Sequence, residues 1–236
     1  MDKILELAKM IDHSILHPTF TDENLKKECE IAVKYNVATV CVKPYHTKQA
    51  AELIKGSDVK VCAVIGFPHG NSSVAIKVAE TEQVIADGAT EVDMVVNIGK
   101  TLQEDWAYVE NELAEISKAT KKHGAILKVI FETDFVTKDE QKIKLCELCS
   151  KYNIEFVKTS TGYGFVKTSD GKYNYTGANE HDIKLMRKHS SASVQVKASG
   201  GVRTLDELLK YKELGVSRIG ATATEVMLEE AKKRFA

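Results

Sequence analysis

The sequence predicts an α/β protein that folds as a single (β/α)8 barrel, or TIM barrel, over residues 1–236. Two observations support this fold class. Short runs rich in Val and Ile, almost continuously apolar, alternate with longer amphipathic runs, which is typical of parallel strands covered by helices. Eight such pairs of strand and helix fit in the 236 residues, and a barrel of this type contains eight.

The strands are predicted from the short apolar runs. They span residues 12–16, 37–42, 59–66, 91–97, 126–132, 155–159, 193–198 and 218–221. The first of these runs has the weakest strand pattern. Without it, the alternative is a doubly wound open sheet.

The helices are predicted from the amphipathic runs between the strands. They span residues 22–36, 47–55, 73–87, 104–123, 137–152, 179–189, 205–214 and 224–235. Thr137 with Glu140, and Thr204 with Glu207, have the spacing of a capping box at a helix start. Gly215 follows the run at 205–214, as expected of a helix stop.

Composition and charge argue against two classes of partner. The net charge is −1, from 33 basic and 34 acidic residues, so no basic surplus indicates binding to nucleic acid or to a membrane surface. Charged residues interrupt the N-terminal apolar residues, and no apolar run approaches roughly 20 residues. We therefore expect neither a signal peptide nor a membrane span. The five cysteines, an odd number, are expected to be free thiols of a cytoplasmic protein.

Cys146 and Cys149 have the CxxC spacing of some metal and redox sites. They fall inside the amphipathic run at 137–152, and no second pair accompanies them. We therefore interpret them as helix packing residues and expect no metal site.

Three lysines are predicted to point into the barrel. Side chains alternate between the two faces of a strand. In the run at 126–132, the face opposite Lys128 is apolar throughout and should meet the helices. The same parity sends Lys158 and Lys197 inward from their own strands. Because reactive groups of such barrels lie at the C-terminal ends of the strands, these side chains should converge there.

Acidic and thiol side chains share this predicted interior. Parity sends Asp93, Glu132 and Cys41 inward, with Asp12 as a further candidate. Desolvation and like-charge repulsion both lower the pKa of a buried lysine, and an amine with a depressed pKa is nucleophilic near neutral pH. Converging lysines with carboxylates therefore indicate a Schiff-base site, with a charge-balanced structural network as the alternative.

Two glycine-containing stretches follow the last two strands and lead into helices. They are residues 199–203, Ser-Gly-Gly-Val-Arg, and residues 220–223, Gly-Ala-Thr-Ala. The loops after the seventh and eighth strands of a barrel, with their backbone N–H groups and a helix N-terminus, often hold phosphate. We predict a phosphate site between these two stretches.

Seven motifs, which come in order and together cover nearly the whole chain, resemble those of the deoxyribose-phosphate aldolases. They are residues 11–16 (IDHSIL), 40–44 (VCVKP), 64–70 (VIGFPHG), 91–95 (EVDMV), 128–133 (KVIFET), 158–162 (KTSTG) and 197–203 (KASGGVR).

The resemblance implies a class I aldolase, a lyase that works without a metal or other cofactor. Such an enzyme cleaves 2-deoxy-D-ribose 5-phosphate to D-glyceraldehyde 3-phosphate and acetaldehyde, and runs the reverse addition. The resemblance implies that Lys158 forms the Schiff base, that Lys197 assists it as the second lysine, and that Asp93 transfers protons. It also implies a set of substrate-binding residues: Asp12, Cys41, Lys128, Thr161, Gly162, Gly200, Gly201, Arg203, Gly220 and Thr222. Relatives are often homodimers or tetramers, so we expect a homo-oligomer.

The chain departs from the family pattern in two places. Residues 165–175 look like an insertion, and we expect a long loop over residues 163–177, beside the phosphate site. Ala223 stands where relatives often have a small hydroxyl residue. A related Schiff-base aldolase with a different aldehyde or phosphosugar substrate therefore stays open. A catalytically silent sugar-phosphate-binding barrel is the other alternative, against which the lysine pair and Asp93 argue.

Overall fold

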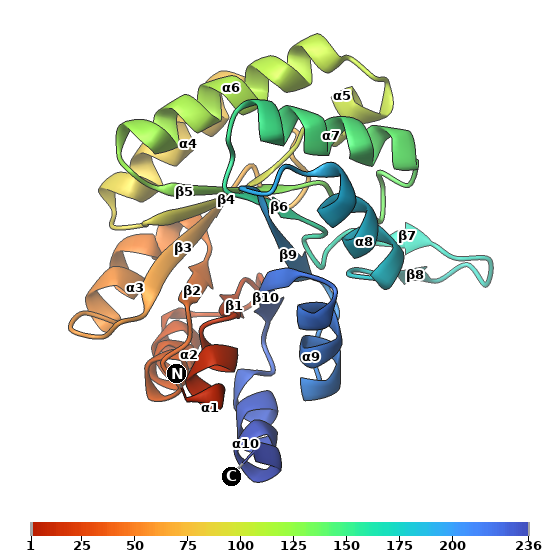
Figure 1. Ribbon diagram of the computed structural model, residues 1–236. Coiled ribbons are helices and arrows are strands. Elements are labelled where there is room, and N and C mark those ends of the chain that lie inside the picture. Colours follow the sequence, from red (N-terminus) through yellow and green to blue (C-terminus); the bar gives the residue numbers. More distant parts are fainter. Residues whose placement is uncertain (1, 236) are drawn as a thin grey trace.

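The computed structural model describes residues 2–235. Eight parallel strands close into a barrel in the order β1-β10-β9-β6-β5-β4-β3-β2 (Figure 1). The strands are β1 (Ile11–Ile15), β2 (Thr39–Val42), β3 (Lys60–Ile65), β4 (Glu91–Val95), β5 (Ile126–Ile130), β6 (Phe156–Lys158), β9 (Gln195–Ser199) and β10 (Val216–Ala221). Asp12 of β1 is in register with Gly220 of β10 on one side and with Thr39 of β2 on the other. This closure confirms the barrel and excludes the open sheet.

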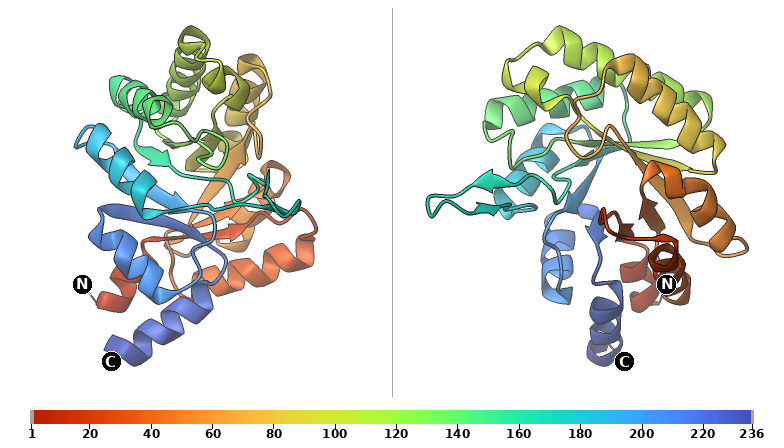
Figure 2. Two further views of the ribbon diagram at one scale, coloured as in Figure 1. Left: turned by 90° about the vertical axis from the view of Figure 1, so that its right-hand side faces the viewer. Right: turned by 180° about the vertical axis from the view of Figure 1, so that it is seen from behind.

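Helices follow the barrel strands and cover the outside of the sheet (Figures 1 and 2). The predicted ones are α2 (Asp22–Lys34), α3 (Thr47–Leu53), α4 (Val74–Ala86), α6 (Trp106–Lys122), α7 (Asp139–Lys151), α8 (Glu180–His189), α9 (Leu205–Glu213) and α10 (Thr224–Phe235). Three short elements were not predicted, α1 (Lys3–Ala8), the 3₁₀-helix η1 (Pro44–His46) and α5 (Ile98–Leu102), because they are too short to show a helical period. Within residues 2–235, no helix combines the length and the apolarity that a membrane crossing requires.

The two predicted capping boxes have different outcomes. At the start of α9, Thr204 and Glu207 form the predicted box. The box predicted at Thr137 is wrong, because α7 begins two residues later and its N-cap residue is Lys138. The Thr-x-x-Glu spacing therefore marked the helix but not its first residue.

The strands separate an apolar layer from a polar interior. Leu127, Val129 and Phe131 are fully buried in the hydrophobic core of the molecule. Lys128 alternates with them and contacts Asp93 inside the barrel. The apolar layer supplies the hydrophobic stabilisation. The charges inside the barrel are tolerated because they are paired with one another, since an unpaired buried charge is very costly.

Residues 163–177 form a hairpin rather than the predicted loop. β7 (Val166–Lys167) pairs in antiparallel fashion with β8 (Tyr173–Asn174), and the hairpin projects beyond the helices (Figure 2). The carboxylate of Asp134 anchors its base by accepting the backbone N–H groups of Thr176, at 2.5 Å, and Gly177, at 3.0 Å. Strands of two residues are too short for the alternating pattern that announces a strand.

Cys146 and Cys149 lie on the buried side of α7, where they pack as predicted. Sγ of Cys146 lies 3.9 Å from the carbonyl oxygen of Met186 in α8. Burial raises the pKa of Cys146 to about 12 and that of Cys149 well above its ordinary value. Both are therefore protonated, unreactive thiols near neutral pH.

Candidate active site

Lys158 and Lys197 meet at one carboxylate inside the barrel. Nζ of Lys158, the last residue of β6, donates to Oδ2 of Asp93 at 2.8 Å, and Nζ of Lys197, in β9, donates to the same oxygen at 2.7 Å. Asp93 lies in the middle of β4 and is fully buried. Because β4 is a neighbour of neither β6 nor β9 in the sheet, these contacts cross the barrel interior.

Lys128 and Asp12 extend this cluster toward the other strands. Nζ of Lys128 lies 2.8 Å from Oδ1 of Asp93 and 2.5 Å from the carboxylate of Glu91. Asp12, on β1, forms an ion pair with Lys197 and lies 3.5 Å from Nζ of Lys128. Side chains from β1, β4, β5, β6 and β9 thus form one buried ionic network.

Arg218, on β10, is a member of this network that the sequence reasoning missed. Its guanidinium lies 2.6 Å from Oδ1 of Asp12 and 3.0 Å from Oε2 of Glu91. It also lies 5.4 Å from the centre of the Phe156 ring, as in a cation–π contact. The sequence does contain a signal for such a cation. Glu91 points into the barrel from the same strand as Asp93, and a second buried carboxylate needs a further positive charge.

The network contains more cations than anions. Its cations are Lys128, Lys158, Lys197 and Arg218, and its anions are Asp12, Glu91 and Asp93. Each cation has a carboxylate partner, but when all of these groups are ionised the network carries one more positive than negative charge. A buried cluster of this kind favours the loss of one proton from a nearby group.

The prediction of a depressed lysine pKa is wrong for two of the three lysines. Burial would lower the pKa of Lys128 and of Lys197, but the nearby carboxylates of Asp12 and Asp93 outweigh it and raise both above the ordinary value. Conversely, burial would raise the pKa of Asp93, but the three ammonium groups hold it well below its usual range. The prediction considered desolvation and like charges but not the attraction of these carboxylates, which makes Lys128 and Lys197 fixed positive charges.

Glu132 supports the loop after Lys158 rather than joining the ionic network. It is fully buried just beyond β5, with a left-handed φ of 56°. Its Oε2 accepts hydrogen bonds from the backbone N–H of Thr161, at 3.2 Å, and from the hydroxyl of Thr161. Its Oε1 has no hydrogen-bond partner among the described residues. Burial, which these hydrogen bonds only partly offset, raises the pKa of Glu132 to about 7.

A cavity of about 460 Å³ opens at the C-terminal ends of the strands. Its lining includes eleven of the predicted site residues: Asp12, Cys41, Lys158, Thr161, Gly162, Lys197, Gly200, Gly201, Arg203, Gly220 and Thr222. Asp93 and Lys128 are fully buried and do not line the cavity. They contact lining residues from behind, so a molecule in the cavity would meet Lys158 and Lys197 but not Lys128.

The two predicted phosphate-binding stretches border this cavity. Gly200 has a left-handed φ of 87°, which favours glycine. Gly177, at the end of the hairpin, packs so closely on it that a Cβ there would lie 2.3 Å from the carbonyl oxygen of Gly200. Gly220 differs from the prediction, because it belongs to β10 itself rather than to the loop that follows.

The hairpin closes one side of the cavity with aromatic side chains that no sequence motif indicated. Tyr163, Phe165 and Tyr175 line the cavity. The rings of Phe165 and Tyr175 pack edge to face with their centres 5.5 Å apart, and Tyr163 packs in the same way on Phe67 at 5.6 Å. A guanidinium nitrogen of Arg203 lies 3.5 Å from the hydroxyl of Tyr175. The hairpin therefore contributes directly to the shape of the site.

The chain is similar to known proteins over almost its whole length. Residues 6–222 match the DeoC/LacD family of aldolases. The chain is 47% identical over 230 residues to the deoxyribose-phosphate aldolase of Rhodopirellula baltica, which covers 98% of this chain and 91% of that one. It is 43% identical over 234 residues to the deoxyribose-phosphate aldolase of Caldanaerobacter subterraneus, which covers 99% and 96%.

The solved structures agree with this assignment. A deoxyribose phosphate aldolase from Aeropyrum pernix, described as having a unique tetrameric structure, superposes with a TM-score of 0.86 at 27% identity, covering 99% of this chain and 94% of that one. The family expected from the motifs is confirmed by these similarities. The chain belongs to the DeoC/LacD family of aldolases.

Proposed function

We propose that this protein is a class I aldolase that cleaves 2-deoxy-D-ribose 5-phosphate to D-glyceraldehyde 3-phosphate and acetaldehyde, and that also catalyses the reverse addition. One observation carries the proposal. Lys158 lines the cavity, and its Nζ lies 2.8 Å from a buried carboxylate that also binds a second ammonium group. The names of the two relatives support this choice of substrate.

Lys158 carries the covalent step. As the neutral amine, it adds to the aldehyde carbon C1 of the open-chain sugar. Loss of water gives an iminium ion, which accepts the electron pair when the bond between C2 and C3 breaks. The C3 hydroxyl loses its proton as D-glyceraldehyde 3-phosphate leaves. The remaining enamine is protonated at C2, and water then releases acetaldehyde and regenerates Lys158.

Asp93 and Lys197 serve these proton transfers. Oδ2 of Asp93 accepts hydrogen bonds from Nζ of Lys158 and from Nζ of Lys197. A proton given up at the reacting amine therefore has an acceptor 2.8 Å away. A positioned acid or base of this kind contributes about 10²- to 10⁴-fold to a rate. Lys128 and Asp12 hold Asp93 and Lys197 in place through the ion pairs described above.

The glycine-rich rim binds the phosphate group. Gly162, Gly200 and Gly201 line the cavity, and we assign their backbone N–H groups to the phosphate, with Arg203 as the positive charge. Thr222 adds a hydroxyl donor just before α10, where Ala223 has none. The remaining residues assigned to the substrate are Asp12, Cys41, Thr161 and Gly220, which line the cavity, and Lys128, which acts from behind them through Asp93.

Borohydride reduction in the presence of substrate tests the covalent step. We expect irreversible inactivation and a reduced adduct on the peptide that contains Lys158, and no activity in Lys158→Ala. Lys167→Ala, which removes an exposed lysine of β7, is the matched control and should behave like the unchanged protein. An unmodified Lys158, or an active Lys158→Ala variant, would sink the mechanism.

A second candidate is a related Schiff-base aldolase with a different aldehyde or phosphosugar substrate. The observation that favours it is the hairpin, which brings Tyr163, Phe165 and Tyr175 into the cavity lining. Comparing kcat/KM for 2-deoxyribose 5-phosphate, for unphosphorylated 2-deoxyribose and for other aldehydes separates the two. Equal efficiency would contradict a working phosphate site, and no turnover with either sugar, or with other aldehydes, would leave a silent binding barrel.

We further propose that residues 1–236 act as one barrel domain and assemble as a homo-oligomer in the cytoplasm. The tetrameric aldolase of Aeropyrum pernix supports the assembly. Sedimentation equilibrium at several protein concentrations tests it, because a monomer at every concentration would refute it.

A further inference from the structure

We propose that Cys41 and Cys62 form a redox modification site, in which hydrogen peroxide joins the two thiols in a disulfide inside the barrel and reversibly stops catalysis. The predicted effect on activity rests on the proposed function. The formation of the disulfide does not, because it depends only on the two thiols and their surroundings.

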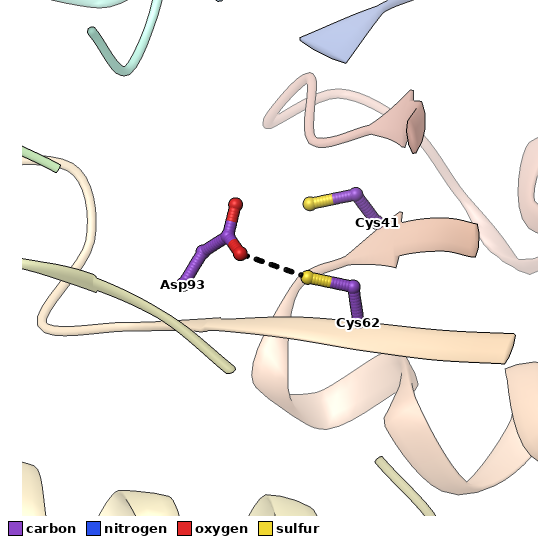
Figure 3. A group of neighbouring side chains, drawn as sticks. All are labelled: Cys41, Cys62 and Asp93. Carbon is purple, nitrogen blue, oxygen red and sulfur yellow. Dashed lines mark hydrogen bonds between the residues drawn. The ribbon is translucent and has the colours of Figure 1, made fainter. Parts of the chain in front are cut away.

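The two cysteines occupy neighbouring positions of the sheet. Cys41 of β2 and Cys62 of β3 are in register, and adjacent strands lie about 4.8 Å apart. This spacing is within the roughly 4.4–6.8 Å between Cα atoms that a disulfide requires. Both side chains point into the barrel toward Asp93 (Figure 3), and their Sγ atoms lie within 4.8 Å of each other. A rotation about the Cα–Cβ bonds, rather than a movement of whole strands, can therefore bring the sulfur atoms together.

Cys41 is the thiol that reacts first. It lines the cavity, which gives a molecule as small as hydrogen peroxide a route to this residue. The neighbouring thiol of Cys62 lowers the pKa of Cys41, burial opposes this, and the ammonium of Lys197 adds to the lowering. A thiolate at Cys41 would also balance the extra positive charge of the network. The thiolate is the form of cysteine that attacks peroxides.

The other three cysteines differ in these respects. Cys29, Cys146 and Cys149 are buried like Cys41, but none of them lines the active-site cavity. Burial raises the pKa of all three, to about 12 for Cys29 and for Cys146. They therefore remain protonated under conditions in which Cys41 reacts.

The reaction balances with hydrogen peroxide as the oxidant. The Cys41 thiolate attacks one peroxide oxygen, the O–O bond breaks, and the products are a sulfenic acid on Cys41 and hydroxide. Sγ of Cys62 then attacks the sulfur of Cys41, the new S–S bond forms, and the hydroxyl leaves as water with a proton. Two thiols lose two electrons in total, and one peroxide molecule becomes two molecules of water.

Cys62 connects this bond to the catalytic carboxylate. Its Sγ donates to Oδ1 of Asp93 at 3.1 Å and lies 3.2 Å from Nζ of Lys128. A disulfide removes the S–H donor and draws the sulfur toward β2. Asp93, which binds Lys158 through its other oxygen, loses one of its supports. We expect activity to fall by roughly tenfold or more, since a positioned proton-transfer group contributes about 10²- to 10⁴-fold.

The experiment treats the folded, unmodified protein with a small excess of hydrogen peroxide. Samples are alkylated, digested with trypsin without reductant and mapped by mass spectrometry. We expect a cross-linked product that joins residues 35–48, which contain Cys41, to residues 61–77, which contain Cys62. Residues 28–34 and 145–151 carry the other three cysteines and should be recovered fully alkylated. Activity should fall as the cross-link accumulates and return with dithiothreitol.

Two variants serve as controls. Cys62→Ala should give no cross-link and no activity that dithiothreitol restores, and Cys146→Ala should behave like the unmodified protein. If Cys62→Ala does not fold, the peptide map of the unmodified protein decides alone. Sulfinic acid on Cys41 with Cys62 still alkylated, or a disulfide that involves another cysteine, would overturn the proposal. A cross-linked protein that keeps full activity would overturn the link to catalysis.

Failure of the proposed function would have a different signature. If borohydride traps no adduct on Lys158, the aldolase mechanism fails, but the cross-link between the two peptides still forms. If trapping succeeds and the cross-link does not form, the redox site fails and the aldolase mechanism stands.

Discussion

Lys158 and Lys197 donate to the same carboxylate oxygen, Oδ2 of Asp93, at 2.8 and 2.7 Å. The lysine that we assign to the covalent step and the lysine that assists it are therefore coupled through a single atom. Lys128 binds the other oxygen of the same group. The effect of any change at Asp93 should reach all three lysines.

Asp93→Asn should lower kcat by roughly 10²-fold or more, because the amide keeps the shape of the carboxylate but cannot accept the proton. The variant should also lose about 3–5 kcal/mol of unfolding free energy, since buried ammonium groups are left without their counter-ion. Steady-state kinetics and urea unfolding measure the two effects. A kcat within tenfold of the unchanged protein would contradict the role of Asp93 in proton transfer.

Two buried lysines provide a matched comparison between stability and catalysis. Lys128 pairs with Asp93 inside the barrel, whereas Lys77 of α4 pairs with Glu112 of α6 at 2.6 Å, outside it. Lys128→Met and Lys77→Met should each cost about 3–5 kcal/mol of unfolding free energy. Only Lys128→Met should also lower kcat in the fraction that remains folded. Equal losses of kcat would show that the two variants act through folding alone.

Glu132 should make stability depend on pH near neutrality. Its pKa is about 7 in the folded chain, against an ordinary value of 4.5, so the folded chain binds this proton more tightly than the unfolded chain does. The raised pKa of Glu132 therefore adds up to about 3 kcal/mol to the free energy of unfolding below about pH 4.5. This contribution is lost as pH rises to about 7.

Glu132→Gln removes this titration, so the variant should gain in stability relative to the unchanged protein as pH rises from about 5 to about 8. Urea unfolding at the two pH values measures the difference. A constant difference between the two proteins at both values would rule out the raised pKa.

Gly177 and Gly171 are both hairpin glycines with left-handed φ, of 69° and 80°. A Cβ on Gly177 would lie 2.3 Å from the carbonyl oxygen of Gly200, whereas a Cβ on Gly171 meets nothing within 4 Å. Gly171→Ala should cost only the backbone strain of about 1–2 kcal/mol. Gly177→Ala should displace the Gly200 loop as well and raise KM for the phosphorylated substrate. The idea fails if both variants show the same KM.

Activity should persist in an excess of a chelator. The iminium formed on Lys158 supplies the electron sink, so the cleavage step needs no Lewis acid. Initial rates before and after dialysis against EDTA provide the measurement. A loss that added divalent cations restore would instead indicate a metal-dependent aldolase.

The periodicity of the sequence predicted much of this structure because parallel strands and their helices leave strong local signals. Parity placed Lys128, Lys158 and Lys197 in one interior, since alternation of side chains is a property of the backbone itself. The sign of the shifts at Lys128 and Lys197 could not be predicted, because the pKa depends on distances to Asp12 and Asp93 that only the folded chain defines.

The hairpin and the orientation of Glu132 could not be predicted from local sequence patterns. The base of the hairpin is held by Asp134, about forty residues away in the chain, and no local sequence pattern indicates this contact. Glu132 shares parity with Lys128 but lies beyond the last residue of β5, where its left-handed φ turns the side chain toward Thr161. Alternation of side chains applies only while the strand continues.

The pairing of β1 with β10 has a consequence for the order in which the chain becomes active during its synthesis. Asp12 is made early, but two of its partners, Lys197 and Arg218, follow 185 and 206 residues later. A ribosome-bound chain that lacks its last two strands holds Lys158 without the second lysine and without the closing wall. An unfinished chain therefore has no closed barrel, and the lysine that we assign to the covalent step gains its full set of neighbours only when synthesis is nearly complete.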